Sequence, residues 1–209
     1  MKNQSITEAM LQFIEESPTA FHAAANVEAL LLENGFEKLE NLAEGALVPG
    51  GSYYTMQNGS AVLAVKIPEN PAKGFRIAAS HSDSPCFKIK EVPEMKVENT
   101  YVKLNVEKYG GMILSPWLDR PLSVAGRVFV AGKDGKPEAK LVNLKKDLLI
   151  IPNVAIHFNR EINNGFAYNP QTDMAPLMGL DQELSIKKLC AEAADVAEEE
   201  ILGSDLYVY

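Results

Sequence analysis

The chain has 209 residues, which is long enough for one large domain or two small ones with a sizeable core. Hydrophobic residues make up 46% and charged residues 23% of the sequence, a composition that excludes an intrinsically disordered chain. The formal net charge of -8 argues against nucleic acid as a partner, because phosphate binding needs a basic surface.

The first segment of the sequence has the pattern of two helices. Apolar residues recur at helical spacing within residues 6–15, which predicts a short amphipathic helix there. Thr19 is a good N-cap, and the Ala- and Leu-rich run over residues 20–33 ends before Gly35, so a second helix is predicted over that run. His22 lies in its first turn and is expected to be structural, because the helix dipole disfavours protonation there.

Strand signals follow the helices. The turn Asn58-Gly59 predicts a β-hairpin, because both residues tolerate positive φ. Its strands are expected over residues 52–57 and 61–67. The compact apolar run Phe75–Ala79 predicts a buried strand that presents the loop Ser80–Pro85 at its carboxyl end. Ligands and catalytic groups of α/β sheets usually lie at that end.

Beyond about residue 92 the sequence becomes rich in β-forming residues. We place a domain boundary within Val92–Lys96, so that residues 1–92 form an α/β domain and residues 93–209 a mainly antiparallel β domain. The β-rich runs are Val97–Val106, Ser123–Ala131, Ala139–Leu144 and Leu148–His157. The rest of this domain is expected to contain an irregular loop over Asn163–Gly179, a helix over Ser185–Ala197 and a strand over Asp205–Tyr209.

The sequence carries no signal for membrane insertion or secretion. No stretch approaches the roughly 20 apolar residues of a membrane span, and residues 1–10 lack the basic-then-apolar pattern of a secretory signal. The two cysteines, Cys86 and Cys190, are too few for a disulfide framework and are expected to be reduced thiols. We therefore expect a cytoplasmic protein without a membrane partner.

Two of the three histidines follow apolar runs and are candidate site residues. His81 and Asp83 form a His-x-Asp pair on a predicted loop, where the carboxylate could orient the imidazole beside a metal. The alternative is a pair of loop residues that make local turn hydrogen bonds. His157 ends the run Ile150–Ile156, so it is either placed for function or satisfied by a neighbour as an ordinary core or edge histidine.

Other polar residues carry weaker signals. Arg120, in Asp119-Arg120, could bind a substrate carboxylate or a partner, although a turn-stabilising ion pair is the favoured interpretation. Cys86 is close to His81 in sequence but is expected to be a small buried thiol rather than a zinc ligand. The sequence contains no nucleotide-binding glycine loop, no His-Glu-x-x-His motif and no nucleophile elbow. Hydrolysis by a serine nucleophile is therefore not indicated.

Several of these segments occur together and in a characteristic order. They are Ser17–His22, Ser80–Pro85, Tyr109–Gly111, Trp117–Arg120, Ala125–Val128 and Ile151–Glu161. With them the chain resembles the amino-terminal half of the aspartyl aminopeptidase family, which are dinuclear zinc exopeptidases. This resemblance implies an α/β fold with a zinc-exopeptidase-like catalytic sheet, incomplete here, and an inserted β-rich, barrel-like dimerisation domain.

The same resemblance implies roles for three residues. His81 corresponds to a zinc ligand, and Asp83 to the carboxylate that orients it. His157 corresponds to a histidine that reaches an active site, that of a neighbouring subunit, where it stabilises the oxyanion or contacts zinc. The implied reaction removes amino-terminal Asp or Glu from peptides with a free amino terminus. Zinc would polarise the scissile carbonyl and activate a water, and a glutamate would take its proton.

The resemblance also implies that a chain of this length lacks part of the metal centre. The paired glutamates, the bridging aspartate and the final histidine of the family lie in its carboxyl-terminal half, and Glu198–Glu200 at a solvated helix end does not replace them. We therefore expect at most part of a two-zinc site, homo-oligomerisation through the β domain, and little or no peptidase activity from the chain alone. The alternative function is a non-catalytic oligomerisation or assembly module derived from such an enzyme.

Overall fold

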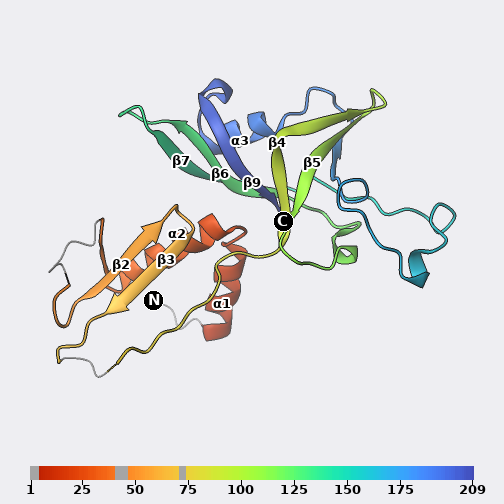
Figure 1. Ribbon diagram of the computed structural model, residues 1–209. Helices are drawn as coiled ribbons and strands as arrows, with labels where there is room; N and C mark the ends of the chain where they lie inside the picture. Colours follow the sequence, from red (N-terminus) through yellow and green to blue (C-terminus); the bar gives the residue numbers. More distant parts are fainter. Residues whose placement is uncertain (1–4, 41–46, 71–73) are drawn as a thin grey trace. The chain divides into compact units, whose positions relative to one another are not determined.

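A computed structural model describes residues 5–40, 47–70 and 74–209. The chain divides into two compact units, unit 1 over Met1–Ser84 and unit 2 over Pro85–Tyr209 (Figure 1). The division precedes the boundary expected within Val92–Lys96. Those residues lie inside strand β4, Cys86–Val97, which pairs with its neighbour from Cys86 onward, so the whole strand belongs to unit 2.

Unit 1 begins with two helices over the predicted residues. They are α1, Ile6–Glu15, and α2, Ala20–Glu33. A capping box begins α1: the Ser5 hydroxyl accepts a hydrogen bond from the Glu8 N–H, and the Ser5 N–H donates to the Glu8 carboxylate. The apolar stripe of α1 is not covered, since no residue of this helix is buried and Ile6 is 90% exposed. Helix α2 does contribute buried side chains, from Phe21, Ala23 and Ala24.

The described strands of unit 1 form a three-stranded sheet in the order β1-β2-β3. Their bounds are Glu37–Lys38, Ser52–Gln57 and Ala61–Lys66. The predicted hairpin joins β2 and β3, and its turn residues Asn58 and Gly59 have φ of 52° and 66°, as a tight hairpin turn requires. Glu28 of α2 ties the helix to this sheet, because its carboxylate accepts from the buried Tyr54 hydroxyl at 2.9 Å and from Lys38 Nζ at 2.8 Å.

The segment Phe75–Ala79 does not form the predicted buried strand. It pairs with no strand among the described residues, and the Phe75 and Ile77 side chains are 88% and 85% exposed. A strand is stabilised by backbone pairing and by contacts of its side chains with neighbouring strands. Neither is available to this segment within the described chain, so its apolar composition alone does not make it a strand.

Unit 2 contains an antiparallel sheet of six strands in the order β7-β6-β9-β4-β5-β8. The bounds of the remaining strands are β5 Tyr101–Tyr109, β6 Val124–Ala131, β7 Pro137–Asn143, β8 Leu177–Gly179 and β9 Ile201–Val208. In the part of the chain that the structure describes, β7 and β8 are the two edges of this sheet. The sheet is therefore open, and the expected barrel-like closure is not seen.

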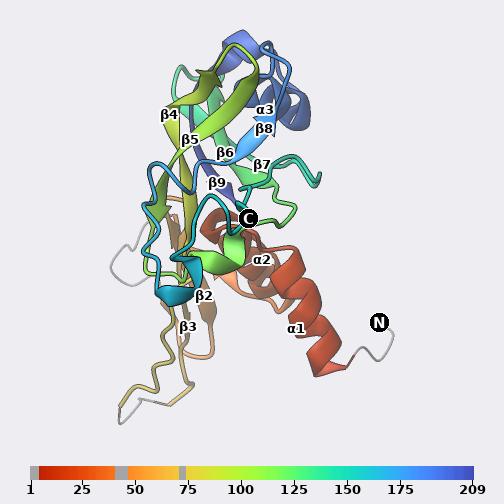
Figure 2. The same ribbon diagram turned by 90° about the vertical axis from the view of Figure 1, so that its right-hand side faces the viewer.

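The core of unit 2 lies between one face of this sheet and helix α3, Ile186–Ala194 (Figure 2). Alternate strand residues point to this face, as the period-2 geometry of a strand dictates. They include Phe87, Leu104, Val124, Val128, Leu206 and Val208, and Ile186, Cys190 and Ala191 of α3 belong to the same buried cluster. Strand β6 requires glycine at position 126, where it pairs with β9, because the Asp205 carbonyl oxygen occupies the place that a Cβ atom would take.

Two further elements of unit 2 are shorter than predicted. The run Leu148–His157 makes only isolated bridges, at Leu149, Ile150 and Ile151. The ladder ends there because Pro152 has no N–H to donate and the Asn153 N–H bonds to a side chain instead. Helix α3 ends before the predicted Ala197, since Asp195 has a left-handed backbone with φ of 53°.

The predicted run Val97–Val106 is not one strand: Val97 ends β4, Glu98 and Asn99 turn the chain with φ of 52° and 50°, and β5 begins at Tyr101. The remaining expected elements of unit 2 are present, with shifted bounds. Residues 163–179 are irregular apart from the end of the short helix η2, Ile162–Asn164, and from β8. The predicted terminal strand is β9, which begins earlier than expected, directly after the short helix η3, Glu198–Glu200. No helix in the described ranges has the length and apolarity needed to cross a membrane.

Candidate functional site

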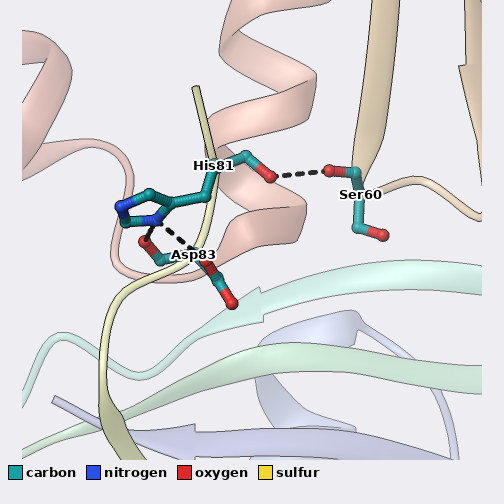
Figure 3. A network of polar contacts seen from close by, with 4 residues as sticks. Ser60, His81 and Asp83 are labelled. Atoms are coloured by element: carbon teal, nitrogen blue, oxygen red, sulfur yellow. Dashed lines mark hydrogen bonds and ion pairs between the residues drawn. The ribbon is translucent and has the colours of Figure 1, made fainter. Parts of the chain in front are cut away.

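The loop that carries His81 is anchored to the β2–β3 hairpin of unit 1. Residues 80–85 have no regular secondary structure, but the Ser82 hydroxyl donates to the Ser60 carbonyl oxygen at 2.8 Å (Figure 3). Ser60 directly precedes β3. This hydrogen bond therefore fixes the residue between His81 and Asp83 against a regular element.

His81 and Asp83 contact each other through a single ring nitrogen. The Nδ1 atom of His81 lies 3.0 Å from Asp83 Oδ1 and 2.9 Å from the Asp83 carbonyl oxygen. The carbonyl oxygen can only accept a hydrogen bond, and so can Oδ1 when the carboxylate is ionised. Nδ1 must therefore carry the proton. In the neutral imidazole the lone pair is then on Nε2, which Figure 3 shows directed away from Asp83. This is the tautomer that a metal-binding histidine uses when a carboxylate holds its other nitrogen.

The pair is open to solvent, with 80% of the His81 side chain and 39% of the Asp83 side chain exposed. An ion pair this exposed contributes little to stability, because water screens it and the side chains lose entropy. A role in orientation is therefore better supported than a role in holding the fold. The geometry leaves Nε2 accessible to a ligand from outside the loop.

The described residues do not bring a complete metal site together. No group of three or more His, Cys, Asp or Glu that could hold a metal ion is present among them. A catalytic zinc ion takes about three protein ligands and keeps one position open. The His81 nitrogen suits zinc as one ligand, and Asp83 suits the supporting position behind it.

His157 lies in a turn rather than at a strand end, where the sequence had placed it. The turn is closed by a 2.9 Å hydrogen bond from the Phe158 N–H to the Ala155 carbonyl oxygen. The His157 side chain is exposed, and no hydrogen bond or ion pair joins it to another described residue. It is therefore not the satisfied core histidine of the alternative interpretation. His157 belongs to unit 2 and His81 to unit 1.

Three other expectations have separate outcomes. His22 is half-buried and its Nδ1 lies 2.8 Å from the Thr19 hydroxyl at the start of α2, in agreement with a structural role. The favoured ion pair between Asp119 and Arg120 is wrong, since no ion pair joins them in the described chain and the Asp119 carboxylate instead accepts from the Asn153 N–H at 2.9 Å. Cys86 is also not the buried thiol that was expected, because it is partly exposed on β4, beyond the boundary of unit 1.

The buried thiol is Cys190, on the face of α3 that meets the sheet. Burial raises the pKa of this thiol to about 12. Since the thiolate is the form that attacks electrophiles and binds metals, Cys190 is an inert core residue.

A second polar cluster lies on the strands of unit 2. Asp205 of β9 accepts from Arg127 of β6 at 2.8 and 3.0 Å, and Lys88 Nζ of β4 lies 3.5 Å from its other oxygen. Burial, and to a smaller extent the nearby negative charge of Asp205, raises the pKa of Tyr207 to about 12. Each charge in this cluster has a partner on an adjacent strand, so the cluster joins strands and is not an open site.

Sequence reasoning missed two contacts around the candidate residues. Ser82 was not singled out, although its position between His81 and Asp83 was a usable signal. The Asp119–Asn153 hydrogen bond joins residues 34 positions apart, so spacing alone did not reveal it. Its two residues do lie in segments that carry the family resemblance, Trp117–Arg120 and Ile151–Glu161.

Comparisons with known proteins place these observations in a family. The profile described as "Aminopeptidase I zinc metalloprotease (M18)" matches residues 13–209. The chain is 43% identical over 218 residues to the probable M18 family aminopeptidase 2 of Clostridium acetobutylicum, covering 100% of this chain and 50% of that protein. The chain thus spans about half the length of the curated relatives it matches.

Solved structures agree with this assignment. A chain in the cryo-EM structure of the Ape4 and Nbr1 complex is 32% identical with a TM-score of 0.88, covering 96% of this chain and 43% of that one. The mApe1 structure of Chaetomium thermophilum is 30% identical with a TM-score of 0.85, covering 97% of this chain and 50% of that one. The predicted family is confirmed, and the chain belongs to the M18 family of zinc metallo-aminopeptidases.

Proposed function

We propose that this chain contributes the His81 side of a zinc site to an aminopeptidase that removes amino-terminal Asp or Glu from peptides. The observation that carries the proposal is the pairing of His81 Nδ1 with two acceptors on Asp83, at 2.9 and 3.0 Å. This pairing leaves the Nε2 lone pair for zinc. Bound zinc would supply a Lewis acid that polarises the scissile carbonyl and lowers the pKa of a water.

Within this proposal Asp83 has a defined task. Its carboxylate keeps the proton on Nδ1 and fixes the rotation of the ring, so that Nε2 keeps one direction. The Ser82–Ser60 hydrogen bond holds the loop in place between these two residues. Carboxylates in this supporting position typically raise metal affinity by roughly 10–100-fold.

We assign the remaining metal ligands to the part of the family sequence that this chain does not span. Catalytic zinc needs about three protein ligands, and the described residues assemble no such group. The chain alone is therefore proposed to have little or no peptidase activity. The relatives that it matches are about twice as long, which leaves room for the missing ligands.

His157 is proposed to act in the active site of a neighbouring subunit, on the developing oxyanion or on zinc. Its support is an exposed position on a turn, without a partner among the described residues. Three apolar neighbours on the same segment, Val154, Ile156 and Phe158, are also exposed. Clustered exposed apolar residues are typical of protein–protein contacts, so unit 2 is the proposed homo-oligomerisation unit.

A reducing, cytoplasmic location is supported by the two free cysteines.

The zinc assignment can be tested on the chain alone by NMR of its histidine side chains. Zinc added to residues 1–209 is expected to perturb the imidazole signals of His81, with the largest change at Nε2. His22, which has the Thr19 hydroxyl on its Nδ1, is the matched control and should respond less. Asp83→Ala should reduce the response of His81 by roughly 10–100-fold in zinc concentration. Equal responses from His22 and His81 would remove the basis of the proposal.

The catalytic part needs an assay of peptidase activity. Purified 1–209 should release little Asp from an Asp-amide chromogenic substrate, with or without zinc. A mixture with the complementary half of the Clostridium acetobutylicum relative should restore release, and Asp and Glu substrates should be cleaved faster than Lys or Leu substrates. Substantial zinc-dependent release by 1–209 alone would refute the proposed inactivity. Preference for Lys or Leu would refute the proposed specificity.

A non-catalytic assembly module is the second candidate. The observation that favours it is the absence of a group of three metal-binding side chains from the described residues. The nucleotide sequence beyond the Tyr209 codon separates the two candidates. An open frame that encodes acidic metal ligands favours the enzyme, whereas a stop codon favours the module.

A further inference from the structure

Asp119 contacts the segment that carries His157 at the point where it leaves the fold. Leu118 forms a parallel bridge with the buried Ile151, and the Asp119 N–H donates to the Ile151 carbonyl oxygen at 2.9 Å. The Asp119 carboxylate then accepts from the Asn153 N–H, also at 2.9 Å. One residue therefore holds the chain on both sides of Pro152.

The backbone of Asp119 is adapted to this double contact. Its φ is 56°, in the left-handed region that most side chains avoid and that Asp and Asn tolerate best after glycine. Asp and Asn are also the residues whose short side chains commonly accept hydrogen bonds from nearby backbone N–H groups. The conformation and the hydrogen bond thus favour the same two residue types.

The hydrogen bond is an isolated anchor. Among the described residues, it is the only hydrogen bond that joins residues 152–164 to a residue outside that segment. The others are local, such as the Val154 N–H to the Asn153 side chain at 2.9 Å. Packing adds little, because Val154 and Phe158 are exposed and a cavity of about 580 Å³ lies beside them, lined also by Leu118 and Asn153.

We propose that Asp119 is a positioning residue, which sets where the His157-bearing segment leaves unit 2 by holding the Asn153 N–H. Its carboxylate fixes the first residue after Pro152, and the turn Ala155–Phe158 follows directly. Arg120 has no part in this contact. The consequence for catalysis rests on the proposed role of His157, whereas the positioning itself does not.

Hydrogen exchange measured by mass spectrometry on residues 1–209 tests the positioning. Asp119→Ala should speed exchange in the first peptide of the 152–164 segment by about fivefold or more, as expected when one hydrogen bond is lost. Asp119→Asn keeps an acceptor and the backbone preference, so it should restore slow exchange. Arg120→Ala is the matched neighbour and should change nothing. Exchange in β6 and β9 should be unchanged in all three variants, which shows that unit 2 is folded.

Two results would overturn the proposal. One is unchanged exchange of residues 152–164 in Asp119→Ala. The other is failure of Asp119→Asn to restore slow exchange while unit 2 stays folded.

Kinetics of the reassembled peptidase separate this proposal from the function of His157. Asp119→Ala should lower kcat by about tenfold through misplacement of the imidazole, and Asp119→Asn should recover it. Faster exchange in Asp119→Ala with unchanged kcat would leave the positioning intact and count against catalysis by His157. Unchanged exchange would overturn the positioning whatever the kinetics.

Discussion

The two units of the chain differ in how they cover their apolar residues. In unit 2, alternate residues of β4, β5, β6 and β9 are buried in one cluster with residues of α3, and Phe87 and Val208 are both 0% exposed. In unit 1, the stripe of α1 and the segment Phe75–Ala79 remain exposed. Because burial of apolar surface is the main favourable term in folding, the described part of unit 2 covers its apolar residues more fully than that of unit 1.

The largest expected effect contrasts one phenylalanine from each unit. Phe87→Ala should destabilise unit 2 by about 3–5 kcal/mol, because it removes a buried ring that packs edge-on against Trp117. The centroids of the two rings are 5.1 Å apart. Phe75→Ala should change the free energy of unfolding by less than about 0.5 kcal/mol, since its ring is 88% exposed. Urea unfolding followed by circular dichroism measures both. Similar losses from the two variants would contradict the contrast between the units.

Two glycines on facing strands of unit 2 give the next largest effect. Gly126→Ala should cost about 1–3 kcal/mol or more, because the new Cβ meets the Asp205 carbonyl oxygen and forces β6 and β9 apart. Gly203 pairs with Phe129 in the same two strands, but a Cβ there meets no atom within 4 Å. Gly203→Ala should therefore be neutral within about 0.5 kcal/mol. A reversed order in urea midpoints would show that the β6–β9 contact is not the constraint.

The ion pair of unit 1 should have a smaller, pH-dependent effect. The pKa of Glu28 is lowered from its ordinary value of 4.5, chiefly by the hydrogen bond from Lys38 and, more weakly, by that from Tyr54. Its contribution is therefore present above pH 4.5 and is lost as the pH falls through the lowered pKa. The pKa of Lys38 is raised from 10.5, mainly by the same pair, so the contribution of Lys38 is lost as the pH rises through the raised value.

Glu28→Gln should consequently lower the stability of unit 1 by about 0.5–1 kcal/mol at pH 7, since the pair is partly exposed. The difference from the unchanged chain should shrink when unfolding is measured near pH 3. Glu33→Gln, on an exposed position of the same helix, is the control and should have no effect at either pH. A cost that persists in acid would show that the lost contact is not the ion pair.

The smallest effect on stability is expected on the exposed stripe of α1. Met10→Gln together with Ile14→Gln should change the free energy of unfolding by about 0.5 kcal/mol or less, because neither side chain is buried. The same change should reduce self-association in light scattering, because it removes exposed apolar surface. Glu15→Gln on this helix should leave association as it was. If the unsubstituted chain is monomeric, the idea that the exposed apolar stripe of α1 drives self-association is contradicted.

Local signals in the sequence were sufficient for some elements. Helices α1 and α2 occupy the predicted residues because caps, apolar spacing and helix formers all lie within the helices or beside them. The β2–β3 hairpin was predicted for the same reason, since Asn58-Gly59 specifies its own turn. The His81–Asp83 contact also follows from sequence, because two residues on one loop at this spacing meet without help from the rest of the fold.

Other features were decided by the tertiary structure. Phe75–Ala79 and Leu148–Ile151 are both apolar runs, yet among the described residues only the second finds partners, in Leu118, Leu122 and Leu177. A strand depends on a neighbour that composition does not name, so the sequence alone could not separate the two runs. The open order of the six-stranded sheet depends in the same way on pairings between strands far apart in the chain.

The sequence therefore determined the family, the local elements and the identity of the candidate residues His81, Asp83 and His157. The tertiary structure decided which residues far apart in the chain contact each other. The Asn153 N–H meets Asp119 only because Leu118 pairs with Ile151, across 34 positions of chain between the bonded residues. The physical reason is that hydrogen bonds act over a few ångströms, so only folding brings such distant groups within reach.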